Sequence, residues 1–450
     1  MLDMAQVSTL KIGDKMSKKR MVVVEGIRTA IGKFGGSLRD VNAEHLLAYC
    51  FRHVVKKSGI DPAQIDEVVV GNICQPVGNI ARVAALIAKV PYSVPASTVS
   101  RNCASGIDAI TKACQAAAAG DGEIFLVGGT ENMSQVPYIM KDARFGMKMQ
   151  HHIVTDGLWE GLFDPFAKQM MGRTAENIVQ KWGITREEQD EYAIRSHQKA
   201  IEAQIGHMFD AQILPIKVLN RMRIKHSDGS NDTLVPQYQI NFSQDESPRK
   251  KLIEEPASAG TFPAMFMHDS ILDPIETDKF IEKDKTYVIE RTVWDEGTVT
   301  AVNSCPINDG AAAILLMTEE KAVSLGLTPL AQVVSYGYTG CDPKLMGEGP
   351  ITAVPKALNK AGLKMNDIDI FELNEAFAAQ AIVCLRGLGL PSEKVNVWGG
   401  AIALGHAVGA TGMSLTVKAM HILKVMKKRR AAITMCVGGG QGGCLIIEGV

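Results

Sequence analysis

The chain carries the stretch Ser58-Gly-Ile-Asp-Pro-Ala-Gln-Ile-Asp66-Glu-Val-Val-Val70, and 303 positions later it carries Ala361-Gly-Leu-Lys-Met-Asn-Asp-Ile-Asp369-Ile-Phe-Glu-Leu373. A glycine, an isoleucine and an aspartate are identical between the two stretches, and three further positions hold an apolar residue in both. Self-similarity at a fixed offset is the mark of an internal repeat. The sequence therefore predicts two copies of one structural unit.

Each copy alternates segments typical of strands with segments typical of helices. The first copy has strand-like runs at Met21 to Gly26, Glu67 to Val70 and Glu123 to Val127, and an amphipathic helix at His45 to Lys57. The second repeats this order with Gln332 to Ser335, Val354 to Ala361, Ile370 to Leu373, Val395 to Trp398 and Ala432 to Val437. This alternation predicts an α/β fold with a largely parallel sheet covered on both faces.

The segment from Lys141 to about Arg291 breaks this alternation. It begins with two helical patterns, Thr174 to Trp182 and Arg186 to Gln204, and becomes polar and loop-like from Asn220 to Lys285. We therefore expect an inserted subdomain of loops and helices. The predicted division is an N-terminal tail (1–21), a first half (22–140 with 293–322), the inserted subdomain (141–292) and a second half (323–450).

Composition narrows the class of protein. The 450 residues are 46% hydrophobic and 22% charged, enough to fill more than one core. A net charge of −1 gives no argument for nucleic acid or an anionic membrane as a partner. Nine cysteines without a Cys-x-x-Cys pair predict neither a disulfide framework nor a zinc site. This favours a reducing compartment, and we expect the cytoplasm, with an organellar matrix as the alternative. No stretch approaches the ~20 apolar residues of a membrane span.

One cysteine stands at the start of a predicted helix. It lies in Thr98-Val-Ser-Arg-Asn-Cys103-Ala-Ser-Gly106, directly before an alanine-rich helical run. The free N–H groups and the dipole at a helix N-terminus favour a thiolate, the form that attacks carbonyl carbon. A buried cysteine that packs as a small hydrophobe is the common alternative.

The repeat supplies a partner for Cys103. The same offset, continued without a gap, places His406 opposite Cys103 and Gly409 opposite Gly106, again before a helix. A pseudo-two-fold axis between the copies would bring the two helix ends face to face. A histidine there is suited to exchange protons near neutral pH. The alternatives are a structural histidine, or a glycine turn that holds a phosphate, for which the usual spacing is missing.

Two further motifs end strands in polar or glycine-rich turns. The first, Met435-Cys436-Val-Gly-Gly-Gly-Gln-Gly442, could aim backbone N–H groups at a developing oxyanion while Cys436 reaches the same site. Taken alone, it is more often a β-turn with a buried cysteine. The second, Glu372-Leu-Asn374-Glu-Ala-Phe377, offers an amide that either caps a helix or orients a water or a carbonyl oxygen.

These four motifs, in this order, resemble the thiolase family over about residues 22–220 and 293–450. The resemblance implies duplicated α/β halves with mixed sheets, and reversible CoA-dependent cleavage of 3-ketoacyl-CoA or condensation of two acetyl-CoA. It implies that Cys103 carries the acyl group, His406 activates it and Cys436 transfers the proton of the acetyl-CoA carbanion. Asn374 would hold a water for one oxyanion hole, and the N–H groups of Cys103 and Gly438 would form the other.

The resemblance also implies how the substrate binds. Coenzyme A acts as substrate, no metal or other cofactor is implied, and family members are usually homodimers or homotetramers. Contacts with the substrate are implied for a set of residues around the motifs and in the inserted subdomain: Met171, Arg249, Ser304, Cys305, Ala376 and Phe377.

Several positions depart from the family pattern. Ala407 stands where the family has proline, Cys305 where it has serine, and Met170 where many short-chain members have histidine. The segment Leu219 to Trp294, with apolar Phe262, Met265, Phe266 and Met267, is about twice the usual length. We expect it either to cover the acyl-CoA entrance and admit longer chains, or to be a surface excursion or an oligomer contact.

Two other functions remain open at this point. Condensing ketosynthases also use a cysteine at a helix N-terminus, but they generally have no second reactive cysteine in the last glycine turn, so Cys436 favours a thiolase. A thiolase-like scaffold that binds acyl-CoA or lipid without catalysis would be indicated by the loss of a catalytic residue, and all four are present.

Overall fold

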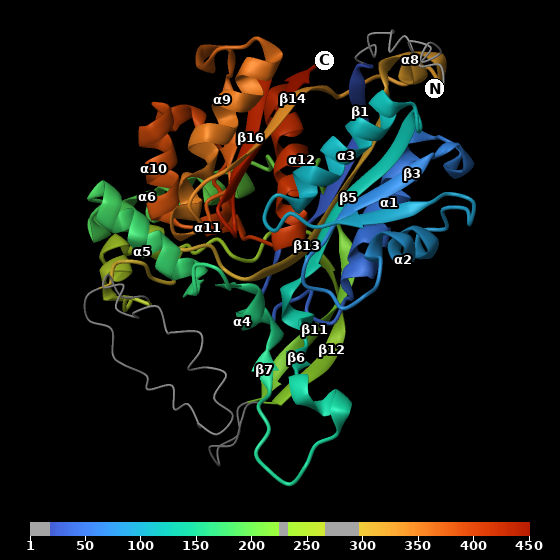
Figure 1. Cartoon of the computed structure of the whole chain (residues 1–450). Helices are drawn as coiled ribbons and strands as arrows, with labels where there is room; N and C mark the ends of the chain where they lie inside the picture. The colour runs from blue at the N-terminus through green and yellow to red at the C-terminus, as the bar shows by residue number, and fades with distance from the viewer. Residues whose placement is uncertain (1–18, 225–232, 266–296) are drawn as a thin grey trace, which may run out of the picture.

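The computed structural model describes residues 19–224, 233–265 and 297–450. Two α/β halves lie side by side, the first in blue and cyan and the second in orange and red (Figure 1). Most of the predicted N-terminal tail, residues 1–18, lies outside the described residues.

The first half is centred on three long strands that are buried along their whole length, as expected for strands covered on both faces. Its strands are β1 (Met21–Thr29), β2 (Gly32–Lys33), β3 (Glu67–Gly71), β4 (Ala96–Val99), β5 (Ile124–Asn132) and β13 (Asn308–Thr318). Its helices are α1 (Ala43–Ser58), α2 (Ile80–Ile87), α3 (Ser105–Ala119) and α8 (Glu319–Ser324).

The second half has the same order of elements. Its strands are β14 (Ala331–Gly340), β15 (Ile370–Leu373), β16 (Arg430–Val437) and β17 (Gln441–Gly449). Its helices are α9 (Gly349–Ala361), α10 (Ala378–Leu388), α11 (Ala401–Leu404) and α12 (Val408–Met426). The predicted Val395 to Trp398 strand is reduced to one bridge, between Val395 and Phe371.

The repeat found in the sequence is confirmed at the level of single atoms. Gly59 and Gly362 both end a helix in the left-handed conformation, with φ of 73° and 69°. Oδ2 of Asp66 accepts hydrogen bonds from the N–H groups of Glu123 and Ile124, where β5 begins. In the second half, Oδ2 of Asp369 accepts the equivalent bonds from Arg429 and Arg430, where β16 begins.

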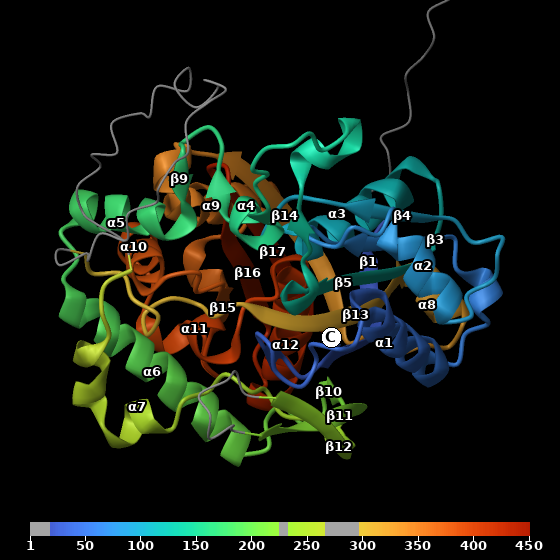
Figure 2. The same ribbon diagram turned by 90° about the horizontal axis from the view of Figure 1, so that it is seen from below.

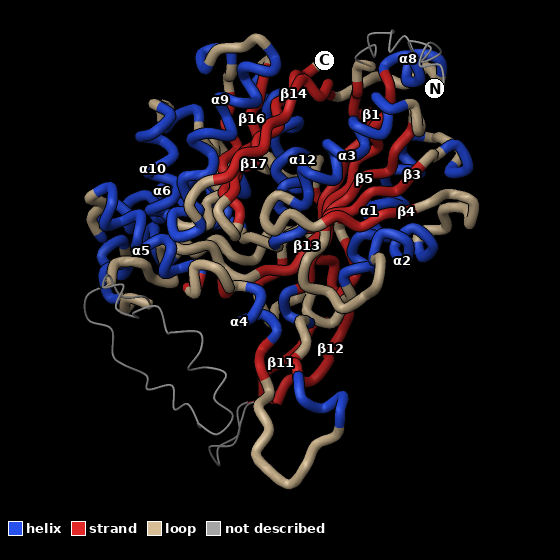
Figure 3. Tube along the Cα trace, viewed as in Figure 1, coloured by secondary structure: helices blue, strands red, loops and turns tan. Residues whose placement is uncertain are grey.

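The two halves share one hydrogen-bonded sheet. In the described residues it has eleven strands, with the path β15-β16-β17-β14-β1-β13-β5-β3-β4. The halves join where β1 pairs antiparallel with β14. The prediction of a largely parallel sheet is wrong, because β13 and β17 run antiparallel to both of their neighbours. The mixed sheets implied by the family resemblance are confirmed, because β3 and β15 have parallel neighbours. Figure 3 shows the strands of both halves in red.

Helices α3 and α12 lie between the halves, while α1 packs on the outer face of the first half and α9 on that of the second (Figures 1 and 2). The two inner helices touch backbone to backbone. A Cβ on Gly106 would collide with the backbone nitrogen of Met413, and a Cβ on Gly412 would lie 2.7 Å from that of Ile107. Only glycine permits this approach.

The inserted subdomain contains more regular structure than the sequence indicated. Its helices are α4 (Gly157–Gly161), α5 (Met171–Trp182), α6 (Arg186–Ile205) and α7 (Lys251–Glu254), and its short strands are β6 (Tyr138–Ile139), β7 (Thr155–Asp156), β8 (Phe163–Asp164), β9 (Gln169–Met170) and β10 (Ile213–Leu214). The expectation of a polar loop from Asn220 is wrong, because β11 (Ile216–Ile224) and β12 (Thr233–Phe242) form an antiparallel hairpin. Phe266 and Met267 lie outside the described residues, and the predicted domain boundaries stay a prediction.

Candidate active site

The two predicted reacting residues stand at equivalent places. Cys103 lies two residues before α3, and His406 lies two residues before α12. Cys103 is half-buried and packs in one small apolar cluster with Val408 and Ile307, and the backbone of Ile307 forms a bridge with His406. The close contact of α3 with α12 thus brings the two helix starts near each other.

A side chain next to Cys103 joins this helix start to the glycine turn of the second half. Asn102 adopts the left-handed conformation, and its Nδ2 donates a 2.8 Å hydrogen bond to the carbonyl oxygen of Gly438. Gly439 and Gly440 continue the turn, with φ of 86° and 76°. Cys436, the second-last residue of β16, is fully buried beside this turn.

The thiol of Cys103 is neutral at rest. Burial raises the pKa of Cys103 to about 11, while hydrogen bonds from the backbone N–H groups of Gly438 and of Cys103 itself lower it. The two amides lower the pKa, as expected at a helix start, but the cost of desolvation outweighs them. Those amides nevertheless lie where a negative charge near the sulfur would be stabilised.

Cys436 is also protonated at rest. Burial raises the pKa of Cys436 well above its usual value, and the neighbouring sulfur of Cys103 raises it further. Cys436 packs in an apolar cluster with Ala376, Phe377 and Met171. The two sulfurs thus lie near enough for the charge of one to affect the other, which suits the transfer of a proton to or from a molecule bound at Cys103.

His406 is held at three atoms. Its backbone N–H donates to Oδ1 of Asn308 at 2.9 Å, its Nδ1 lies 2.6 Å from Oγ1 of Thr411, and its Nε2 lies 3.4 Å from Nδ2 of Asn374. Burial lowers the pKa of His406 to about 4, so the imidazole is neutral near pH 7. A neutral imidazole can accept a proton, as a general base must.

Asn374 does not cap a helix. Helix α10 begins four residues later, and Phe377 takes the N-cap position without a side-chain bond. Asn374 is instead fully buried at the end of β15, and its Oδ1 has no hydrogen-bond partner among the described residues. A buried polar atom without a partner is costly, so a water or substrate group is expected to meet this oxygen.

Four predicted substrate contacts come together in one strip of backbone. Ser304 forms an antiparallel bridge with Phe377, and the N–H of Cys305 donates to the carbonyl oxygen of Ala376 at 3.0 Å. The hydroxyl of Ser304 is buried without a partner in the described part of the chain. Burial raises the pKa of the Cys305 thiol, and the nearby Cys103 sulfur adds to this effect.

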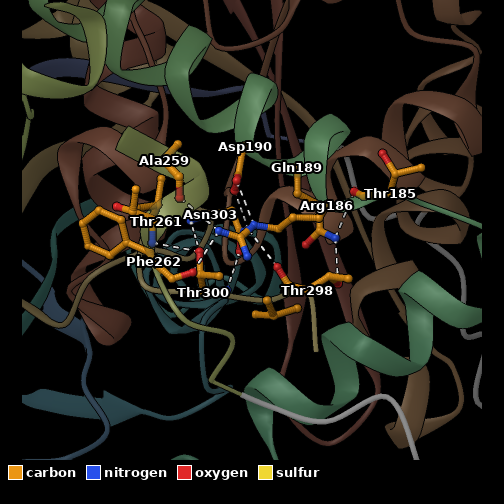
Figure 4. A network of polar contacts seen from close by, with 12 residues as sticks. Thr185, Arg186, Gln189, Asp190, Ala259, Thr261, Phe262, Thr298, Thr300 and Asn303 are labelled. Atoms are coloured by element: carbon orange, nitrogen blue, oxygen red, sulfur yellow. Dashed lines mark hydrogen bonds and ion pairs between the residues drawn. The ribbon is translucent and has the colours of Figure 1, made fainter. Parts of the chain in front are cut away.

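A polar network fixes the segment that leads into this strip (Figure 4). Arg186 donates to the carbonyl oxygens of Ala259 and Phe262, and its Nε lies 2.8 Å from Asp190. Asp190 in turn accepts a 2.9 Å hydrogen bond from Nδ2 of Asn303. Asn303 directly precedes Ser304, so helix α6 sets the position of the strip through this network.

The other two predicted contacts are placed differently. Met171 begins α5, and its sulfur would lie 3.4 Å from a Cβ on Gly438, so it borders the glycine turn. Arg249 lies further along the insert, where its backbone N–H donates to Nδ1 of His197 at 3.1 Å. No contact within the described residues connects Arg249 with Cys103.

The sequence analysis missed three residues that shape the site: Asn102, Asn308 and Thr411. A signal existed for each, because they lie inside or beside the motifs of Cys103, Cys305 and His406. Their side chains fix backbone groups or ring atoms of the reacting residues, and such contacts cannot be read from a linear sequence.

The chain matches two consecutive family models over most of its length. The model described as "Thiolase, N-terminal domain" matches residues 21–258 and 275–320, and "Thiolase, C-terminal domain" matches residues 327–449. A "Probable acetyl-CoA acyltransferase" of Staphylococcus epidermidis is 42% identical over 432 residues, which are 95% of this chain and 98% of that protein. A protein of the same name from Staphylococcus aureus is 40% identical over 95% of this chain and 99% of its own length.

Two solved structures of thiolase-family enzymes are also similar to this chain. The acetyl-CoA acetyltransferase of Bacillus anthracis is 38% identical, with a TM-score of 0.84 over 96% of this chain and 100% of its own. Human mitochondrial 3-ketoacyl-CoA thiolase in complex with CoA is 33% identical, with a TM-score of 0.82 over 96% of this chain and 98% of its own.

The lowered pKa of His406 predicts a pH dependence of stability. The usual pKa of a histidine is 6.5, and in the folded chain that of His406 is about 4. At a pH between these two values, His406 therefore binds a proton in the unfolded chain but not in the folded chain. The contribution of this residue to the free energy of unfolding is therefore complete above pH 6.5 and is lost as the pH falls toward 4. The native protein should lose more stability than His406→Asn between about pH 7 and about pH 5, measured by urea unfolding.

The exposed His45 provides the control, since His45→Asn should leave the native pH dependence unchanged. Equal losses in the native protein and in His406→Asn would show that the imidazole is not kept neutral by burial.

Proposed function

The chain belongs to the thiolase family, and from this premise we propose that Cys103, His406, Cys436 and Asn374 carry out acyl transfer between coenzyme A thioesters. The chain is an acyltransferase that cleaves 3-ketoacyl-CoA with CoA to acetyl-CoA and a shortened acyl-CoA, or condenses two acetyl-CoA in reverse. One observation carries the assignment of roles: two backbone N–H groups are directed at the Cys103 sulfur, and His406 is kept neutral close by.

In cleavage, the sulfur of Cys103 attacks the 3-keto carbon while its proton passes to His406. Both groups start neutral, so charge develops only during the reaction. The new oxyanion would lie against the N–H groups of Cys103 and Gly438, which already face the sulfur. Preorganised donors of this kind stabilise a transition state without reorganising.

The bond between C2 and C3 then breaks, and its electron pair leaves as the enolate of acetyl-CoA. We assign Cys436 as the acid that returns a proton to this carbon, because its thiol is protonated, buried and close to Cys103. The enolate oxygen would be met by His406 and by a water that the unpartnered Oδ1 of Asn374 holds.

The acyl-enzyme on Cys103 is released by a second thiol. The thiol of CoA gives its proton to the Cys436 thiolate left by the first half-reaction and attacks the thioester carbon. The Cys103 sulfur leaves and takes back the proton that His406 holds. Thiolates are good nucleophiles and good leaving groups, so the exchange is close to balanced and ping-pong kinetics follow. No other cofactor enters this proposal.

We assign the binding of the pantetheine part of CoA to the strip around Ser304, Cys305, Ala376 and Phe377, with Met171 at the glycine turn. The packing of three of these residues around Cys436 supports this assignment, as does the structural relative in complex with CoA. Arg249 is proposed to contact the adenine end of CoA, where a cation would meet a phosphate.

The alternatives are less well supported. A decarboxylating ketosynthase does not explain why a protonated Cys436 lies beside the nucleophile. A scaffold that only binds acyl-CoA or lipid does not explain the pair of amides at the sulfur or the neutral base. The relatives named acetyl-CoA acyltransferase agree with the enzyme reading.

We also propose a cytoplasmic location, with an organellar matrix as the alternative, because all nine cysteines are free thiols. The described part of the chain contains no helix that is both long and apolar enough to span a bilayer.

Oligomeric state gives the first prediction that follows from the proposed function. Strand β4 is the outer strand of the sheet and has a partner on one side only in the described residues, and open edges are commonly covered by another chain. We propose a homodimer or a homotetramer. Size-exclusion chromatography with light scattering should give twice or four times the mass of the chain at micromolar concentration. A mass of one chain at every concentration would contradict this.

The second prediction concerns the acylated residue. Incubation with acetyl-CoA followed by peptide mass mapping should find an acetyl group on Cys103. The modification should disappear in Cys103→Ser, because an alcohol buried beside a neutral base is a far weaker nucleophile than a thiol. Cys74→Ser is the matched control, since it changes a nearby thiol without a proposed role and should keep the acetyl group. Undiminished acetylation of Cys103→Ser would show that Cys103 is not the acylated residue.

The third prediction separates proton transfer from acylation. Cys436→Ala should still accept an acetyl group on Cys103 while losing about 10²- to 10⁴-fold of thiolysis and condensation, the usual contribution of a general acid or base. Cys444→Ala removes another buried thiol from the neighbouring strand and should retain turnover. If Cys436→Ala turns over at the native rate, the thiol in the glycine turn has only a packing role.

A further inference from the structure

We propose that Thr411 is a positioning residue that fixes the tautomer of His406, so that Nδ1 carries the hydrogen and Nε2 presents its lone pair to the site. This inference rests on the proposed function and assigns a role to a residue of the first turn of α12 that the catalytic motifs do not name.

The first observation is how the threonine hydroxyl uses its single hydrogen. Oγ1 of Thr411 donates to the carbonyl oxygen of Ala407 at 2.9 Å, one turn earlier in the chain. The same oxygen lies 2.6 Å from Nδ1 of His406. Because a hydroxyl has only one hydrogen, its contact with the ring must be accepted from an N–H on Nδ1. A neutral imidazole with hydrogen on Nδ1 has a free lone pair on Nε2.

A second observation on the other side of the ring points to the same tautomer. The Nδ2 amide group of Asn374, which can only donate, lies 3.4 Å from Nε2. A hydrogen on Nε2 would face this donor, whereas a lone pair accepts from it. The oxygen of the same amide remains unpartnered in the described residues and points to a separate acceptor role. The contacts with Thr411 and with Asn374 are therefore both satisfied by the same tautomer, with hydrogen on Nδ1 and a lone pair on Nε2.

The surroundings keep Thr411 in place. Its side chain is 5% exposed and lies in the first turn of α12, where the N–H of Gly409 is tied to the buried carboxylate of Glu131 at 3.0 Å. The acceptor for the threonine is a backbone carbonyl, so the replacement of the family's proline by Ala407 leaves the contact available. With the backbone N–H of His406 held by Asn308, the ring is fixed at its backbone and at both nitrogens.

This tautomer decides which nitrogen of His406 accepts a proton during the reaction. With hydrogen already on Nδ1, only Nε2 can accept the proton that leaves the Cys103 thiol, and the imidazolium that forms keeps its Nδ1–H on Thr411. Without the hydroxyl, the ring would divide between two tautomers and rotate more freely, and only part of the enzyme would present a base. The rate of acyl transfer should then fall while the binding of CoA thioesters stays unchanged, because Thr411 touches no proposed substrate contact.

The test compares three variants by single-turnover acetylation of Cys103 with acetyl-CoA and by steady-state kinetics. Thr411→Val keeps the shape of the side chain and removes the hydroxyl, whereas Thr411→Ser keeps the hydroxyl. Thr411→Ala also removes the hydroxyl and replaces the valine variant if that variant does not fold. We expect the valine and alanine variants to acetylate about 10- to 100-fold more slowly with KM within about two-fold of the native value, and the serine variant to acetylate within about three-fold.

The outcomes separate this inference from the proposed function. Equal rates in the native protein and in Thr411→Val or Thr411→Ala would overturn the role of Thr411 alone, as would a serine variant as slow as the valine variant. A rise in KM at constant kcat would also overturn it, because that result assigns Thr411 to binding. Absence of any acetyl group on Cys103 in the native protein would instead overturn the proposed function.

Discussion

The close contact between α3 and α12 is the constraint on which the site depends. At Gly106 and Gly412 no side chain fits between the two backbones, so the helices of the two repeats approach nearer than ordinary packing allows. Their starts carry Cys103 and His406 at equivalent positions. A nucleophile and a base that are 303 positions apart in sequence thus meet because two copies of one unit pack around a shared inner layer.

Burial decides the resting charges of this site. Desolvation raises the pKa of Cys103 and lowers that of His406, so the pair rests as a neutral thiol and a neutral imidazole rather than as an ion pair. The amides of Cys103 and Gly438 and the amide of Asn374 are already in place before charge forms. This arrangement favours the charged transition state over the ground state, which is the requirement for raising kcat.

Much of this could be read from the sequence, and the limits have physical causes. The repeat, the helix starts and the four motifs depend on local pattern, and the structure places them together as that pattern indicates. Strand direction depends on partners such as β13, which enters the first half after the whole inserted subdomain, so the prediction of a parallel sheet was wrong. The backbone amides lower the pKa of Cys103 as the sequence indicated, but the larger effect of burial is a property of the folded chain and could not be read from the sequence. Asn308 and Thr411 were missed because their importance lies in contacts with single atoms of His406.

The proposed mechanism depends on an acyl group held on Cys103 with its oxygen between two amides. A crystal structure of the protein after reaction with acetyl-CoA would show this intermediate. We expect a thioester on Sγ of Cys103, with the acetyl oxygen within about 3 Å of the backbone nitrogens of Cys103 and Gly438. An acetyl group on another thiol, or an acetyl oxygen turned away from both amides, would contradict it.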